Sequence, residues 1–261
     1  MKRSKHFFAD GPLLDMIKVN FSHEIDFGHY PFSLDIIKNL KDIQFSSAVT
    51  FFVGENGTGK STILEAIAHN AGFGAEGGSK NIHFKTSEET TYSAAQNLAE
   101  QLTLSWRHKP KNGYFFRAES FFNVANYIDH IARFAGGPEK AYAPYGGKSL
   151  HEQSHGESFL SFFKNRLGDG GFFIFDEPEA ALSPARQLSL LCIIHELCKN
   201  NAAQFIIATH SPILLAYPDA TIYSCDSETL TTIAYPDTQN YQITKSFLDS
   251  HTRYLQHLFK D

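Results

Sequence analysis

The stretch GENGTGKS, residues 54–61, matches the phosphate-binding loop pattern G-x-x-x-x-G-K-[ST] at every constrained position. An apolar run with the composition of a β-strand, residues 49–53, precedes it, and a helical pattern at residues 63–68 follows it. A strand, a glycine-rich loop and a helix in this order form the context in which such a loop binds phosphate. The alternative is a glycine-rich turn that matches by chance, and the two flanking elements argue against it.

The residue types of this loop suit a triphosphate and its metal ion. Glycine lets the backbone curl so that successive N–H groups point into one concavity, and the following helix adds the positive end of its dipole. Lys60 brings a full charge to the outer phosphates, and the Ser61 hydroxyl can bind Mg²⁺. We therefore predict that ATP and Mg²⁺ bind at Gly54, Glu55, Asn56, Gly57, Thr58, Gly59, Lys60, Ser61 and Thr62.

The composition is that of a folded protein with one α/β domain. The chain has 261 residues, of which 42% are hydrophobic, and this is enough for a sizeable core. Its formal net charge of -5 gives no overall attraction to nucleic acid or acidic lipid. The three cysteines form no C-x-x-C pair, and the sequence has neither an apolar run of bilayer length nor a signal-peptide pattern. We expect a soluble, cytoplasmic protein without direct membrane insertion.

The second half of the chain alternates regularly between strand and helix patterns. Strands are predicted at 172–175, 204–208 and 220–224, and helices at 186–199 and 213–216. Buried, continuously apolar strands that alternate with helices are typical of parallel sheets. A mostly parallel central sheet is therefore expected.

The other segments are less regular. Short strands are predicted in residues 1–50, helices at 91–104 and 121–134, and a strand at 113–117. The last residues, 241–259, read as a helix that packs on the domain. We predict a single domain over residues 1–261, with its core at 15–225, an inserted lobe at about 72–150 and a C-terminal helical segment at 241–261.

Acidic residues follow the predicted strand at 172–175. Asp176 comes at its carboxyl end, where open α/β sheets bind ligands, and can hold Mg²⁺ directly or through water. Because side chains alternate along a strand, Glu177 points elsewhere and can polarise an attacking water molecule. Glu179 is interpreted as a charge at a helix start beside Pro178. The alternative is an ordinary strand end with acidic loop residues, and the phosphate loop in the same chain favours the metal site.

A histidine occupies the corresponding place after another strand. The apolar strand at 204–208 ends in Thr209 and His210, and Pro212 stands where a helix can start. His210 is thereby placed to contact the γ-phosphate or the attacking water. A structural histidine is the alternative, and position rather than residue type carries the prediction.

A second helix start has the residues of an anion site. Ser154, His155, Gly156 and Glu157 open an apolar helix near 156–165, and its first backbone N–H groups can bind a phosphate. A chain with two phosphate-binding helix ends suggests that two copies clamp each nucleotide between them. A capping box made by Ser154 and Glu157 is the simpler interpretation, and both can hold together.

In this order the motifs resemble those of the ATP-binding cassette (ABC) ATPases, over residues 15–225. Residues 54–61 match Walker A, 154–158 the signature motif, 172–177 Walker B with its catalytic glutamate, and His210 the switch histidine. The run EPEAALSP after Walker B is similar to that of soluble ATPases of the recombination and chromosome-maintenance branch rather than of transporters.

The resemblance implies an α/β fold of the P-loop NTPase class with three layers. The expected parts are a mostly parallel central sheet, an N-terminal antiparallel β subdomain and an inserted helical lobe. It also implies ATP hydrolysis with Glu177, His210 and Lys60 as catalytic residues, and a head-to-tail homodimer that sandwiches two nucleotides. In that dimer, the signature residues of one copy would reach the nucleotide of the other, through Ser154, Gly156 and Glu157. The metal ligands would be Ser61, Asp176 and Glu119.

The sequence departs from the family pattern at three places. The signature has His155-Gly156-Glu157 where the family has Gly-Gly-Gln, and the usual D-loop acid is replaced near Ser183. No clear Q-loop glutamine is present, and Glu119, just after the strand at 113–117, is the best positional candidate.

The residue that stacks on adenine is left open. Phe27, Tyr30 and Phe32 are candidates, and each is an equally good core residue.

The function that these motifs favour is a soluble, dimerising ABC-type ATPase that acts on a protein partner still to be identified. The alternative is the nucleotide-binding subunit of a membrane transporter, whose catalytic core would look the same. A small-molecule kinase is a third interpretation, and Glu177 beside Asp176 argues against it. Binding of nucleic acid rests on family analogy alone.

Overall fold

The centre of the molecule is a six-stranded sheet with the order β5-β6-β7-β3-β8-β9. The computed structural model describes residues 11–74, 77–79, 89–119, 121–143, 147–149, 163–164, 167, 170–201 and 203–259. Neighbouring strands from β5 to β8 run parallel, and β9 pairs antiparallel with β8. The strands are β3 (Val49–Val53), β5 (Gly113–Arg117), β6 (Gly171–Asp176), β7 (Ala203–Ala208), β8 (Thr221–Ser224) and β9 (Thr231–Thr232). The mostly parallel central sheet predicted from the sequence is confirmed.

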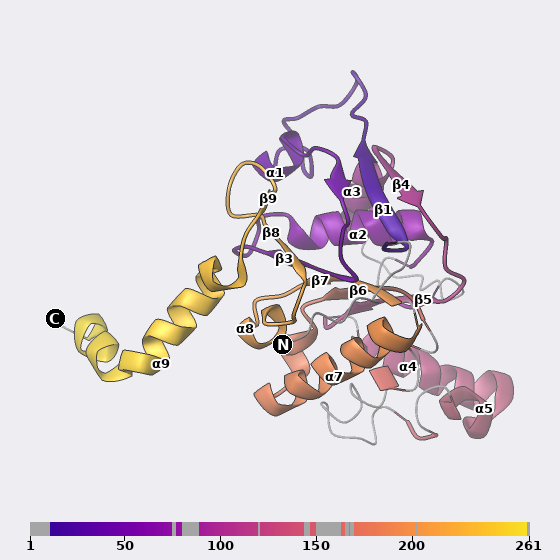
Figure 1. The fold of residues 1–261 in the computed structure, drawn as a ribbon. Helices are drawn as coiled ribbons and strands as arrows, with labels where there is room; N and C mark the ends of the chain where they lie inside the picture. Colours follow the sequence, from indigo (N-terminus) through magenta and orange to yellow (C-terminus); the bar gives the residue numbers. More distant parts are fainter. Residues whose placement is uncertain are drawn as a thin grey trace.

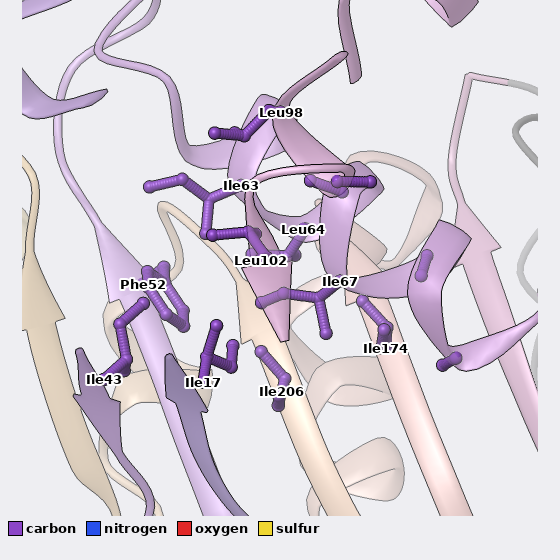
Figure 2. Packing of buried hydrophobic residues seen from close by; sticks show 14 of the residues in the cluster. Ile17, Ile43, Phe52, Ile63, Leu64, Ile67, Leu98, Leu102, Ile174 and Ile206 are labelled. Atoms are coloured by element: carbon purple, nitrogen blue, oxygen red, sulfur yellow. The ribbon is translucent and has the colours of Figure 1, made fainter. Parts of the chain in front are cut away.

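A second, smaller sheet is antiparallel and has the order β2-β1-β4. Its strands are β1 (Leu14–Val19), β2 (Ile43–Gln44) and β4 (Leu102–Trp106). Helix α2 (Lys60–Ala71) lies between the two sheets (Figure 1), and Figure 2 shows its side chains close to those of both sheets. It is apolar on several sides because it contacts both sheets, and Ile63, Leu64 and Ile67 are each 0% exposed.

Helices cover the opposite face of the central sheet. The core on this side contains residues of α7 (Pro184–Asn201), α8 (Pro212–Leu215) and α4 (Phe121–Ile131). Side chains alternate along β6, so that Ile174 joins the core around α2 while Phe173 and Phe175 join the core around α7. The sheet is thus buried on both faces, and the three-layer α/β fold is confirmed (Figure 1).

The segment predicted as a helix at 91–104 divides into a helix and a strand. Helix α3 (Glu89–Ala99) ends before β4, so the prediction was wrong for the residues from Leu102 onward. Leu102 pairs with Val19 of β1 and is 6% exposed. Strand β1, which is distant in sequence, supplies the backbone hydrogen-bond partners of β4. The local helical pattern could not reveal this pairing.

The range expected as an inserted lobe, residues 72–150, contributes to both sheets. Strand β4 belongs to the small sheet and β5 to the central one. The helical part of the range consists of α3, of α4, of the π-helical turn η1 (Ala132–Gly136) and of α5 (Pro138–Tyr142).

The C-terminal helix projects away from the rest of the fold. Helix α9 (Gln239–Leu258) has no buried residue, and among the described elements its main contacts are with α8 and the short 3-10 helix η5 (Tyr235–Asp237) (Figure 1). The helix was predicted correctly, but the expectation that it packs on the domain was wrong for all but its first turn. Among the described residues, no helix is long and apolar enough to cross a membrane.

Candidate active site

The phosphate loop connects the carboxyl end of β3 to the first turn of α2. Gly59 is the N-cap residue of α2 and has a φ of 101°, a left-handed value that favours glycine. A Cβ atom on Gly59 would lie 3.0 Å from the Cγ2 atom of Ile36, whereas one on Gly57 would meet nothing within 4 Å. The loop is therefore packed against the protein at Gly59 and open at Gly57, on the side where a ligand could approach.

Lys60 holds the loop in shape from within. Its side chain is 4% exposed, and the ammonium group donates hydrogen bonds to the carbonyl oxygens of Gly54 at 2.6 Å and Glu55 at 2.8 Å. An ammonium group has three donors, so one remains to meet a phosphate oxygen.

Asp226, which follows β8, anchors the loop from outside. Its carboxylate oxygen Oδ1 accepts a hydrogen bond from the backbone N–H of Glu55 at 2.8 Å. The other oxygen, Oδ2, accepts from the hydroxyl of Ser224 at 3.2 Å. Sequence reasoning missed this residue, because 171 positions separate it from Glu55 and only the parallel pairing of β3 with β8 brings them together.

Two of the three residues predicted to hold Mg²⁺ meet in the structure. The hydroxyl of Ser61 donates to Oδ1 of Asp176 at 3.1 Å, although the residues are 115 positions apart. Burial raises the pKa of Asp176 to about 6, while the Arg117 guanidinium opposes this shift. A hydroxyl and a carboxylate are the hard oxygen donors that suit Mg²⁺, which usually takes one or two protein ligands and completes its shell with phosphates and water. The pair fits the ion, and no cluster of three His, Cys, Asp or Glu side chains suited to a metal occurs among the described residues.

Arg117 is the cation next to this pair. It ends β5 directly opposite Asp176 in the register of the sheet, and its Nε lies 3.7 Å from Oδ2 of that residue. Its Nη2 lies 3.1 Å from Oε1 of Glu65, a buried residue of α2 whose pKa burial raises to about 7. The rule that found Asp176, a charged residue at the carboxyl end of a buried strand, applies equally to Arg117 and could have found it.

Glu119, the candidate for a further metal ligand, points into solvent. Its side chain is 85% exposed, and Oε2 lies 3.4 Å from Nη2 of Arg117. Arg117 therefore lies between Glu119 and the pair formed by Ser61 and Asp176. Among the interactions of the described residues, Glu119 makes no contact with either member of this pair.

Glu177 and His210 face each other across the ends of β6 and β7. Oε1 of Glu177 lies 3.6 Å from Nε2 of His210. Glu177 has a φ of 50°, which is rare for a residue with a side chain, and its N–H donates to the carbonyl of Ala208 at 3.0 Å. The side chain of Glu177 thus lies next to His210, whereas that of Asp176 accepts a hydrogen bond from Ser61. Local strain of this kind is common at functional sites.

Glu179 does more than start a helix. It lies in the 3-10 helix η4 (Pro178–Ala181), as a helix-start charge would, but its Oε1 accepts a hydrogen bond from the backbone N–H of His210 at 2.6 Å. Burial raises the pKa of Glu179, and the hydrogen bond from His210 opposes this shift. The interpretation as a simple dipole charge was incomplete, because the sequence could not show that η4 packs beside the end of β7.

The aromatic candidates for adenine stacking separate into two kinds. Phe27 and Phe32 form edge-to-face ring contacts with Phe21 and with each other, at centroid distances of 5.7 to 6.3 Å. Tyr30 is 53% exposed, and its hydroxyl lies 2.7 Å from that of Thr62 in the first turn of α2. Tyr30 is thus the one of the three with a hydrogen bond to the phosphate-loop helix. The signature residues Ser154, Gly156 and Glu157 lie outside the described residues.

Two family models match the chain, each over less than half of its length. One, described as "AAA domain", matches residues 27–131 and includes the phosphate loop. The other, described as "AAA domain, putative AbiEii toxin, Type IV TA system", matches residues 97–216 and includes Asp176, Glu177 and His210. No curated protein matches the chain.

Solved structures of two kinds are similar in fold. A chain of a metal-chelate type ABC transporter in an inward-facing conformation has a TM-score of 0.50 and 14% identity, over 90% of this chain and 88% of that one. CbiO1 from Clostridium perfringens, part of the ABC transporter complex CbiONQ, has a TM-score of 0.49 and 16% identity, over 95% and 99%. The SMC head domain from Thermotoga maritima has a TM-score of 0.41 and 15% identity, over 85% and 98%.

These similarities concern the fold of the protein. The chain has the fold of the ABC-type ATPases within the P-loop NTPases, and the AAA-domain models agree with the resemblance drawn from the motifs. The preference for the chromosome-maintenance branch stays a prediction.

Proposed function

We propose that this protein is a Mg²⁺-dependent ATPase that hydrolyses ATP in a head-to-tail homodimer and uses the cycle to switch its conformation. The observation that carries the proposal is the contact between Ser61 and Asp176 at 3.1 Å, directly beside a glycine-rich loop closed by Lys60. It joins the two motifs of a phosphate-and-metal site that lie far apart in sequence. The location of Glu177 and His210 at the neighbouring strand end supports hydrolysis as the reaction.

Each residue has a separate role in the proposed reaction. The loop amides and Lys60 bind the β- and γ-phosphates, and Ser61 and Asp176 hold Mg²⁺, which neutralises phosphate charge when bound. Glu177 accepts a hydrogen bond from a water molecule and orients it toward the γ-phosphorus. The water oxygen forms the new bond to phosphorus while the bond to the bridging oxygen breaks, so that ADP leaves with the electron pair of that bond and the proton of the water passes to Glu177 or to the released phosphate. His210, beside Glu177, contacts the γ-phosphate or this water.

The dimer completes the site in this proposal. Ser154, Gly156 and Glu157 of one copy would reach the nucleotide of the other, as the family resemblance implies. The cytoplasm is the proposed location, and a protein partner would receive the conformational change.

Phosphate release from ATP tests the proposal. The wild-type protein should hydrolyse ATP only with Mg²⁺. Lys60→Ala should abolish hydrolysis and weaken nucleotide binding, while Lys41→Ala, at an exposed lysine just before β2, should keep both. Wild-type turnover in Lys60→Ala would contradict the proposal.

A trapped complex tests the dimer. Glu177→Gln should bind ATP, hydrolyse it about 10²-fold or more slowly and accumulate as a dimer, because the residue that orients the water is lost while the binding groups remain. Light scattering with and without ATP measures this, and Glu196→Gln on the exposed face of α7 is the matched control. A monomer with the native rate would exclude the assigned role.

The same trapped dimer distinguishes the proposed function from its alternatives. Copurification of Glu177→Gln with a membrane protein of several spans would favour a transporter subunit. Binding of DNA that weakens steeply with salt would support the branch suggested by family analogy. A requirement for an acceptor molecule before ADP is released would indicate a kinase.

A further inference from the structure

His210 is held at both of its backbone polar groups by side chains from distant parts of the chain. Its N–H donates to Oε1 of Glu179 at 2.6 Å, and its carbonyl oxygen accepts from Nδ2 of Asn240 at 3.0 Å. Glu179 lies in η4 after Walker B, and Asn240 lies in the first turn of α9. The two contacts span 31 and 30 sequence positions, so they depend on the tertiary fold and not on a local turn.

The residues on either side of His210 have their own anchors. The N–H of Thr209 donates to the carbonyl of Phe52 in β3 at 3.2 Å. The hydroxyl of Ser211 accepts hydrogen bonds from the backbone N–H groups of Ile213 and Leu214 at the start of α8, each at 3.2 Å. The loop is thus fixed before and after His210. Glu179 and Asn240 add the contacts that fix the orientation of His210 itself.

The ring of His210 depends on that orientation. Its Nε2 atom is buried, makes no hydrogen bond among the described residues and lies 3.6 Å from Oε1 of Glu177. A distance of 3.6 Å is too long for a hydrogen bond, so no direct bond between these side chains holds the ring in place. The position of the ring therefore depends on the backbone of His210, and Glu179 and Asn240 hold that backbone.

Glu179 also ties His210 to Glu177. The two glutamates flank Pro178, whose ring restricts the backbone between them. Glu177 faces the His210 ring while Glu179 binds the His210 backbone. A displacement of η4 therefore moves the glutamate and the histidine together.

We propose that Glu179 and Asn240 are positioning residues for His210, and that the first turn of α9 is therefore part of the hydrolytic apparatus. This inference rests on the proposed ATPase function and deepens it. Neither residue touches the nucleotide in this account, since both act through the backbone of His210. A shift of a catalytic group by about 1 Å can cost as much as 10²-fold in rate, which sets the scale of the effect.

Kinetics of four variants test the proposal. Glu179→Ala and Asn240→Ala should each lower kcat about tenfold or more with KM for ATP changed less than about threefold. Glu179→Gln keeps an acceptor oxygen of the same shape and should lose much less than Glu179→Ala. Gln242→Ala is the matched control, because this amide of the same helix turn donates to the carbonyl of Pro236 and not to His210. It should keep the wild-type kcat.

The background of His210→Ala separates positioning from general stability. If both residues act through His210, adding Glu179→Ala or Asn240→Ala to His210→Ala lowers kcat no further. A further fall of the same size, or wild-type kcat in Asn240→Ala, would overturn the inference. Asn240→Asp, which keeps the shape but loses the donor, should fall at least as far as Asn240→Ala and serves if the alanine variant fails to fold.

The two levels of failure are distinct. If the wild-type protein does not hydrolyse Mg²⁺-ATP, the proposed function fails, and this inference fails with it. If the wild type is active and the variants behave like the control Gln242→Ala, only the positioning role fails.

Discussion

Helices α2 and α9 both lie next to the proposed site, but the protein holds them in different ways. Helix α2 is enclosed by two sheets, and nine of its twelve residues are buried. Helix α9 has twenty residues and none of them is buried. Packing on all sides fixes α2, and with it the phosphate loop. A few polar contacts at one end fix α9. Its orientation should therefore matter little for the stability of the fold and more for the position of His210, which it contacts through Asn240.

The largest difference should appear when one apolar side chain is shortened in each helix. Ile67→Ala in α2 removes a side chain that is 0% exposed and lies between Ile174 and Ile206 in Figure 2, so the free energy of unfolding should fall by about 2–5 kcal/mol. Leu248→Ala in α9 shortens a residue that is 68% exposed and should change it by less than about 0.5 kcal/mol. Denaturant unfolding measures both. Equal losses would mean that α9 is packed in solution.

This contrast also separates what the sequence could predict from what it could not. The phosphate loop, Asp176 and Glu177 were found because their patterns are local, with a strand that delivers each polar group to the edge of the sheet. Strand β4 was missed because Leu102 is held by Val19, more than eighty positions earlier. Asp226 and the backbone contacts of His210 were missed for the same reason, since each depends on which strands or helices lie side by side. Arg117 is different, because it ends a buried strand as Asp176 does and the same local rule could have found it.

Helix α9 shows a different limit of prediction from sequence, because the helix was found but its packing was not. The sequence predicted that this helix packs on the domain, and its apolar residues include Ile243 and Phe247. The structure leaves them 53% and 37% exposed. Periodicity thus identified the helix correctly, but it could not indicate whether a surface of this chain covers it.

A second, smaller effect concerns Glu65, the buried carboxyl group of α2. Burial raises the pKa of Glu65 to about 7. At a pH between its ordinary pKa of 4.5 and this raised value, the carboxyl group therefore keeps its proton in the folded protein and loses it in the unfolded chain. Stability should therefore fall as pH rises from about 5 to 7, by up to about 1.4 kcal/mol per pH unit from this group. Glu65→Gln removes the titration and should make the slope shallower.

Unfolding by denaturant at pH 5 and pH 7 measures that slope. Glu196→Gln, an exposed glutamate of α7, is the control and should leave it unchanged. If the slope of Glu65→Gln equals that of the wild type, the guanidinium of Arg117 offsets the burial of Glu65 completely.

Two glycines of the phosphate loop should differ by a smaller amount. Gly57 and Gly59 have φ values of 83° and 101°, so alanine is strained at both. At Gly59 the new Cβ would also lie 3.0 Å from Ile36, whereas at Gly57 it meets open space. Gly59→Ala should therefore lower stability by about 1 kcal/mol more than Gly57→Ala. Thermal unfolding of the two variants measures this difference, and a larger loss in Gly57→Ala would contradict the packing described for the loop.

The smallest effect should come from removing the far part of α9. The helix departs from helical geometry at Ser250, and the residues beyond it are exposed or half-buried within the described chain. Deletion of residues 251–261 keeps Asn240 and its hydrogen bond to His210, so both the unfolding free energy and kcat should stay at the wild-type values. Deletion of residues 239–261 removes Asn240 and should lower kcat about as much as Asn240→Ala, with little loss of stability, because no residue of α9 is buried. Should the shorter deletion also lower kcat, the projecting part of α9 would contribute to hydrolysis through contacts that a single copy of the chain does not make.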